Sequence, residues 1–81
     1  MAKHEVKAML PGMFYRKPSP DQPNYKEVGD RVNVGDVLGL IEVMKSFHEV
    51  QSDAAGTVTA FPTESEDAIM PGQTLVEIET G

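Results

Sequence analysis

Cysteine is absent from the 81-residue chain. Without it the protein can build neither a disulfide framework nor a cysteine-based zinc site, so its stability must come from closing its own core. A chain of this length forms one domain and buries only about 60% of the surface that the open chain exposes. We therefore expect a single domain over residues 1–81, in a reducing compartment.

Long apolar runs are also missing. No segment approaches the roughly 20 apolar residues that a membrane-spanning helix requires. The first ten residues, MAKHEVKAML, do not resemble a signal peptide, because His4, Glu5 and Lys7 interrupt them. We expect a cytoplasmic protein with no membrane partner.

Basic residues are too few for a nucleic-acid binder. Seven lysines and arginines stand against 13 acids, which gives a formal charge of −6. Nucleic-acid recognition needs Lys and Arg gathered on one face, so we expect no nucleic-acid partner. The acidic character suits docking to basic surfaces on larger proteins.

Helical periodicity is absent, whereas short apolar or alternating segments recur along the chain. Seven glycines and six prolines divide these segments at short intervals. This pattern predicts an all-β sandwich or barrel. The expected strands are residues 4–10, 13–16, 37–43, 46–51, 57–61 and 74–79.

An internal repeat relates the two halves of the chain. Residues 32–42, VNVGDVLGLIE, match residues 69–79, IMPGQTLVEIE, at an offset of 37. Residues 11–14 match residues 55–58 at an offset of 44, in the same order along the chain. Neither half can bury its own apolar face, so we expect two interlocked halves.

Met44 and Lys45 separate two expected strands by the length of a tight hairpin loop. Such loops prefer Asn or Gly, because their backbone needs positive φ. A residue pair that breaks this preference at an exposed tip is a candidate functional site. The plain alternatives are a solvated loop lysine at position 45 and a core-filling methionine at position 44.

A proline-rich segment lies between residues 16 and 25. It cannot supply the donors of a central strand, so we expect an exposed loop whose base Tyr15 and Tyr25 could close. A plain loop and a short proline-rich ligand peptide are the alternatives to a functional loop. Its central residues are Lys17, Pro18, Ser19, Pro20, Asp21, Gln22, Pro23 and Asn24.

Other polar residues give weaker signals. His4 and His48 have no third ligand at metal-site spacing, so we expect no metal. The acidic run at residues 64–67 is typical of a solvated turn. The turn glycines are followed by no helix, so they form no phosphate loop.

Several segments together resemble biotinyl (biotin/lipoyl attachment) domains, over about residues 5–79. Residues 42–45, EVMK, resemble the family's E-A-M-K-M attachment motif, and residues 28–42 resemble its lead-in. Residues 53–58, DAAGTV, resemble the D-x-x-G-x-V that follows the motif, and residues 71–75 its final strand entry. The run FYR followed by PSPD resembles an insertion, the "thumb", of carrier domains in bacterial acetyl-CoA carboxylases.

The resemblance implies a flattened β-barrel, or barrel-sandwich hybrid, of two four-stranded antiparallel sheets with quasi-twofold symmetry. The thumb would occupy about residues 16–25 and reach towards the cofactor, and the attachment hairpin would occupy residues 41–50. The chain would be a non-catalytic carrier with biotin in amide linkage to Lys45. Its partners would be a biotin protein ligase that uses ATP, a biotin carboxylase that takes the carboxyl group from bicarbonate, and a carboxyltransferase that acts on acetyl-CoA to form malonyl-CoA for fatty acid synthesis.

The residues around Lys45 are those that the ligase would recognise. Glu42 and Met44 match the motif, whereas Val43 stands where Ala is usual and Ser46 where Met is usual. Two other readings stay open: a lipoyl or H-protein-like carrier, and an unmodified barrel-sandwich module used only for protein contacts.

Overall fold

The computed structural model describes residues 2–80, and these residues form strands, turns and loops without any helix. No helix that could cross a membrane therefore exists in this part of the chain. The strands are β1 (Ala2–Lys7), β2 (Gly12–Tyr15), β3 (Arg31–Val32), β4 (Val37–Val43), β5 (Ser46–Gln51), β6 (Gly56–Ala60), β7 (Asp67–Ile69) and β8 (Thr74–Thr80).

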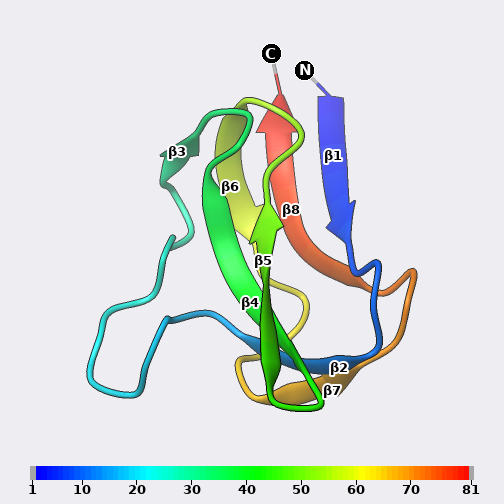
Figure 1. Cartoon of the computed structure of the whole chain (residues 1–81). Coiled ribbons are helices and arrows are strands. Elements are labelled where there is room, and N and C mark those ends of the chain that lie inside the picture. Colours follow the sequence, from blue (N-terminus) through cyan, green and yellow to red (C-terminus); the bar gives the residue numbers. More distant parts are fainter. Residues whose placement is uncertain (1, 81) are drawn as a thin grey trace.

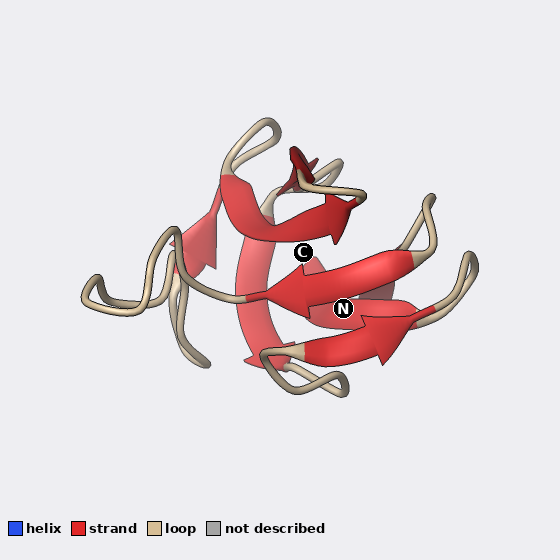
Figure 2. Cartoon of the chain, turned by 60° about the horizontal axis from the view of Figure 1, so that its bottom comes forward, coloured by secondary structure: helices blue, strands red, loops and turns tan. Residues whose placement is uncertain are grey.

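The strands form two four-stranded sheets. One sheet has the order β1-β8-β6-β3 and the other β5-β4-β2-β7. Every paired neighbour is antiparallel. Figure 2 shows the strands arranged around a common interior, with loops at their ends. The predicted all-β fold of two four-stranded antiparallel sheets is confirmed.

Quasi-twofold symmetry relates the two sheets strand by strand. β1 and β5 have the same length and lie 44 residues apart in sequence, while β4 and β8 have the same length and lie 37 apart. The same offsets place β2 on β6 and β3 on β7, so one sheet order maps onto the other. The repeat detected in the sequence is thus the structural repeat.

Two glycines occupy equivalent crossings in the two halves. A Cβ atom on Gly12 would collide with the carbonyl oxygen of Glu42, and one on Gly56 would collide with that of Glu79. Only a residue without a side chain lets β2 approach β4, and β6 approach β8, this closely. The symmetry therefore extends to individual backbone contacts.

The core lies between the sheets and draws on both halves. Its largest fully buried side chains are Phe14, Leu38, Leu75 and Ile78, each with no exposed surface. Burying one such side chain stabilises the fold by about 1.5–3 kcal/mol relative to leaving it in water. The continuous apolar run of β4 is explained by this position, because three of its apolar residues belong to the core. These are Leu38, Leu40 and Ile41.

The β4–β5 hairpin lies at one end of the barrel, and the start of β1 and the end of β8 lie at the other (Figure 1). Ala2 and Thr80 are partners in the β1–β8 register. Because β4 and β5 correspond to β8 and β1, the position equivalent to the hairpin turn is the gap between the strand ends at Thr80 and Ala2. The two halves therefore differ at this position, because a turn joins β4 to β5 whereas no turn joins β8 to β1 within residues 2–80.

Most expected strands agree with the structure to within two residues at each end, but the structure departs further from the expectation at two places. Residues 8–10 were expected to continue the first strand, but β1 ends at Lys7. The β1–β8 register shifts between Val6 and Lys7, and the Ala8 amide then donates to the Gln73 carbonyl at 2.8 Å. The acidic run expected to be a turn ends in β7, because Asp67 pairs with Phe14. In both places a tertiary partner decides where the strand ends.

Candidate functional site

The turn between β4 and β5 consists of Met44 and Lys45, as the sequence predicted. Val43 and Ser46 pair directly below it. Both turn residues have positive φ, 49° at Met44 and 69° at Lys45, as in the hairpin turns that normally carry Asn or Gly. A left-handed backbone costs a residue with a side chain roughly 1–2 kcal/mol. The turn is therefore held in a geometry that its own residues disfavour.

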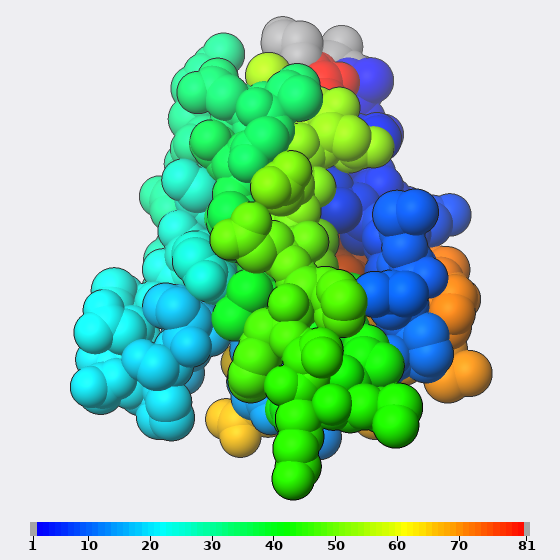
Figure 3. Space-filling model, viewed as in Figure 1, coloured from blue at the N-terminus to red at the C-terminus, as the bar shows by residue number. Residues whose placement is uncertain are grey.

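The side chains at the tip point into solvent. Lys45 is exposed, and it makes no hydrogen bond or ion pair within the described residues 2–80. Met44 is 93% exposed, so it does not fill the core. Figure 3 shows the hairpin (green) as the lowest projection of that face. The amine is thus accessible from several directions.

A groove of about 350 Å³ lies beside the hairpin, between β5 and the loop of residues 17–24, which we call the thumb. The thumb projects sideways from the barrel (Figure 1, cyan). Phe47, two residues after Lys45, is 59% exposed, and its ring lies 6.3 Å from that of Tyr15 at 54°. The groove is lined by Tyr15, Lys17, Pro18, Ser19, Pro20, Leu40, Phe47 and Glu66.

Tyr15 connects the groove to the hairpin. Its hydroxyl donates to Oε1 of Glu42 at 3.0 Å, and the Met13 sulfur lies 3.2 Å from the Tyr15 hydroxyl oxygen. Because the hydroxyl has one proton, the carboxylate is the stronger acceptor of the two. The hydrogen bond to Glu42 raises the pKa of Tyr15, and burial and the charges of Glu42 and Glu66 add to it. Glu42 is therefore fixed three residues before Lys45.

The thumb contains a small turn of its own. The Gln22 amide donates to the Ser19 carbonyl at 3.1 Å, and the Ser19 hydroxyl donates to Oδ1 of Asp21 at 2.7 Å. This hydroxyl, aided by a backbone hydrogen bond, lowers the pKa of Asp21. The proline-rich loop is accordingly a largely exposed projection with an internally hydrogen-bonded turn, and its contact with a cofactor stays a prediction.

A second groove, of about 440 Å³, lies between the edge strands β1 and β5, away from the thumb. Both strands carry the tripeptide His-Glu-Val, at residues 4–6 and 48–50, which the sequence analysis did not detect. The two copies are 44 residues apart, the same offset that relates residues 11–14 to residues 55–58, and this offset could have revealed them. Nε2 of His4 lies 2.6 Å from Oδ1 of Asp53. Residues 2–80 contain no group of three metal-ligating side chains.

Comparison with known proteins agrees with this geometry. The family described as "Biotin-requiring enzyme" matches residues 4–79 of the chain. The chain belongs to this family. The match covers both halves of the barrel, which the quasi-twofold symmetry relates, and also the hairpin turn, which has no counterpart in the other half.

Two relatives of this chain have the same name as each other. The biotin carboxyl carrier protein of acetyl-CoA carboxylase from Haemophilus influenzae is 37% identical over 79 residues, covering 98% of this chain and 51% of the relative. Its counterpart from Streptococcus pyogenes is 40% identical over 74 residues, covering 91% and 45%. The chain spans about half the length of these relatives.

A solved structure has the same fold as this chain. The urea carboxylase of Kluyveromyces lactis matches with a TM-score of 0.78 at 23% identity, covering 98% of this chain and 6% of that enzyme. A likeness at this identity concerns the fold alone. The same architecture therefore occurs inside a much longer chain.

The predicted site residues fall at two places around the tip. Glu42 and Val43 end β4, Met44 and Lys45 form the turn, and Ser46 begins β5. Residues 17–20 of the thumb share the groove with Phe47, whereas Asp21, Gln22, Pro23 and Asn24 do not line it. Sequence reasoning named neither Phe47 nor Tyr15 as part of the site, because exposed aromatic residues on strands are common.

Proposed function

We propose that this chain is the biotin-bearing carrier domain of an acetyl-CoA carboxylase, with biotin joined to the Nζ atom of Lys45. The observation that carries the proposal is an exposed lysine at the tip of a strained two-residue turn, in a chain whose relatives are named as such carriers. The domain itself would perform no catalysis.

The residues around Lys45 fit an attached group of this kind. The amine has no partner among residues 2–80 that would have to be displaced, and a ligase using ATP could form the amide bond there. The adjoining groove offers apolar walls from Phe47 and Leu40, with polar atoms from Ser19 and Glu66 at its margins. When bound, biotin would accept a carboxyl group at one enzyme and give it up at another.

The contribution of the protein is to hold the arm in place. The β4–β5 pairing continues to Val43 and Ser46, so the arm would swing from a rigid base. Tethering replaces free diffusion of the cofactor by a high effective concentration near each partner. A strained turn fits this role, because ligand-facing positions are where proteins retain unfavourable backbone geometry.

The partners proposed are a biotin protein ligase, a biotin carboxylase and a carboxyltransferase, with the cytoplasm as location. Glu42, Val43, Met44 and Ser46 surround Lys45 and would be read by the ligase. Among the described residues 2–80, Met44 is the most exposed large apolar residue, at 93%, which suits it to burial against a partner. The thumb, residues 17–24, would contact the attached biotin from the other side of the groove.

The test is the mass of the intact chain after incubation with a purified biotin ligase, biotin and ATP. We expect a gain of one biotin, located on Lys45 by peptide mapping and lost in Lys45→Arg. Lys7→Arg is the matched control, because Lys7 is also exposed but lies on β1, and it should be modified normally. Absence of biotin, or lipoylation in its place, would contradict the proposal.

A second measurement tests the carrier role. The biotin-loaded chain is offered to a purified bacterial biotin carboxylase with ATP and bicarbonate, and carboxyl transfer to acetyl-CoA is followed after adding a carboxyltransferase. Transfer that depends on the loaded chain, and is absent with Lys45→Arg, supports the assignment. A chain that accepts biotin but supports no transfer would contradict the carboxylase part alone.

A further inference from the structure

The outer part of the thumb is not bonded to the barrel. Among residues 18–23, the hydrogen bonds within the described chain are those that join Ser19 to Gln22 and to Asp21. Prolines stiffen this part, but they do not orient it relative to the hairpin. The direction of the thumb must therefore be decided at its base.

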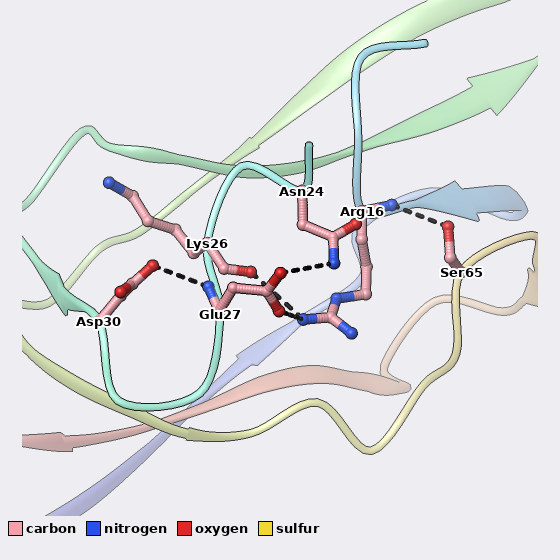
Figure 4. Close-up of polar contacts among 6 residues, drawn as sticks. All are labelled: Arg16, Asn24, Lys26, Glu27, Asp30 and Ser65. Atoms are coloured by element: carbon pink, nitrogen blue, oxygen red, sulfur yellow. Dashed lines mark hydrogen bonds and ion pairs between the residues drawn. The ribbon is translucent and has the colours of Figure 1, made fainter. Parts of the chain in front are cut away.

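Arg16 forms one side of that base, directly before the thumb (Figure 4). Its Nη2 donates to Oε1 of Glu27 at 3.0 Å and to the Lys26 carbonyl at 3.2 Å. Its guanidinium carbon lies 3.8 Å from the centre of the Phe61 ring. One planar side chain thus joins the returning end of the loop to the barrel, which is a geometry that Lys cannot reproduce.

The backbone of Arg16 extends this junction. Its amide donates to Oγ of Ser65 at 3.1 Å, and its carbonyl accepts from the Tyr25 amide at 2.8 Å. Asn24 adds a bond from Nδ2 to the second carboxylate oxygen of Glu27, at 3.1 Å. Both ends of the thumb and the β6–β7 connection therefore meet at one residue.

Burial distinguishes Arg16 from an ordinary surface ion pair. Its side chain is 21% exposed, whereas that of Glu27 is 62% exposed. An exposed ion pair contributes little stability by itself. The stacking on Phe61 and the hydrogen bond to the Lys26 carbonyl must therefore supply much of the energy that keeps the Arg16 side chain in place. The buried Nε of Arg16 has no hydrogen-bond partner, which indicates that ring packing rather than ideal hydrogen bonding sets the position of the guanidinium.

We propose that Arg16 is a positioning residue that fixes the thumb beside the hairpin and thereby forms the wall of the groove next to Lys45. Lys17 and Pro18 follow it directly and line that groove opposite Phe47. Any rotation of the backbone at position 16 therefore moves the wall. The consequence for an attached cofactor rests on the proposed function, whereas the positioning of the thumb does not.

Backbone relaxation by NMR on the unmodified full chain tests the positioning. In Arg16→Gln we expect the order parameters of Ser19, Asp21 and Gln22 to fall from roughly 0.85 to below 0.6, the range of flexible backbone. Met44 and Lys45 should keep their values. Arg16→Lys should give an intermediate loss, because it keeps the charge but not the planar fork.

Arg31→Gln is the matched control, because Arg31 is exposed on β3 and should leave the thumb unchanged. Glu27→Gln provides a second variant in case Arg16→Gln fails to fold, since it weakens the same junction while keeping the arginine. We expect a smaller fall at the same thumb amides. Thumb amides that keep their order in a folded Arg16→Gln or Glu27→Gln chain would overturn the proposal.

The functional consequence is read from the biotin-loaded chain as substrate of a purified biotin carboxylase. A cofactor resting in the groove is unavailable to the enzyme, so losing the wall raises the competent fraction and lowers the apparent KM, by roughly two- to fivefold, with kcat unchanged. An unchanged or higher KM with a loosened thumb overturns the inference that the groove wall retains the attached cofactor. Failure of Lys45 to accept biotin overturns the proposed function instead, and leaves the relaxation result standing.

Discussion

The Tyr15 hydroxyl donates a 3.0 Å hydrogen bond to Glu42 and thereby links β2 to the strand that leads into the Lys45 turn. Tyr15 is also the last residue before Arg16 and the thumb. The hairpin and the thumb are therefore both bonded to one pair of adjacent residues: Tyr15 bonds to the strand of the hairpin, and Arg16 bonds to the returning end of the thumb.

This contact predicts an unusual titration of Tyr15. Its pKa is raised above 10.0, first by the hydrogen bond to Glu42 and least by the charge of Glu66. The neutral phenol is thus favoured in the folded chain, and the contact is lost only as pH rises through the raised pKa. In ¹³C NMR titrations we expect Glu42→Ala to return the pKa of Tyr15 most of the way to 10.0 and Glu66→Gln to change it less. A Tyr15 pKa that stays as high in Glu42→Ala as in the unaltered chain would contradict the contact.

The thumb turn predicts an effect at acidic pH. The pKa of Asp21 lies below 3.8 because the Ser19 hydroxyl donates to the ionised carboxylate. The turn is therefore favoured above pH 3.8 and weakens as pH falls through the lowered pKa. Ser19→Ala should raise the pKa of Asp21 towards 3.8, as measured by side-chain carboxyl NMR. Ser65→Ala, which lies outside the turn, should leave it unchanged, and equal shifts in both variants would argue against the assigned cause.

The strained turn predicts a variant that is more stable but less functional. Met44→Asn places a residue that tolerates positive φ at a position with φ 49°, and we expect the free energy of unfolding in urea to rise by up to about 1 kcal/mol. Met70→Asn is the control, since Met70 is 66% exposed but has no positive φ, and it should bring no gain. We expect Met44→Asn to accept biotin more slowly. A loss of stability in Met44→Asn would show that the methionine supports the turn.

The symmetry predicts equal consequences for equivalent core residues. Leu38 and Leu75 lie 37 residues apart on β4 and β8, and both are fully buried. Truncation of either to Ala should lower the free energy of unfolding by about 2–5 kcal/mol, with the two values agreeing closely. Val34→Ala, at a residue that is 68% exposed, should change it by less than about 0.5 kcal/mol. Very different losses of unfolding free energy in Leu38→Ala and Leu75→Ala would mean that the two halves do not contribute equally to stability.

The sequence predicted the elements whose residues carry their own signal. β4 and β5 were expected with the bounds that they have, because an apolar run of strand length and a two-residue interruption define them. β3 and β7 were not expected, since two or three residues are too few for periodicity to show. They exist because their partners β6 and β2 supply the hydrogen bonds.

The site was predictable at the turn but not around it. Met44 and Lys45 stood out because they break the residue preference of a two-residue hairpin loop, and their φ values confirm that the loop has the positive-φ backbone that normally selects Asn or Gly. The groove depends on Phe47, Tyr15 and the thumb meeting in space, which no local pattern encodes. The junction of Arg16 with Glu27 and Phe61 likewise joins residues that are 11 and 45 positions apart.

The placement of Ala2 and Thr80 at the end of the barrel opposite Lys45 has a mechanical consequence (Figure 1). Any polypeptide joined to either strand would leave from the pole farthest from the lysine. The barrel would then act as a stiff spacer. The distance that an arm on Lys45 could reach would exceed the reach of the joining segment by the length of the barrel itself.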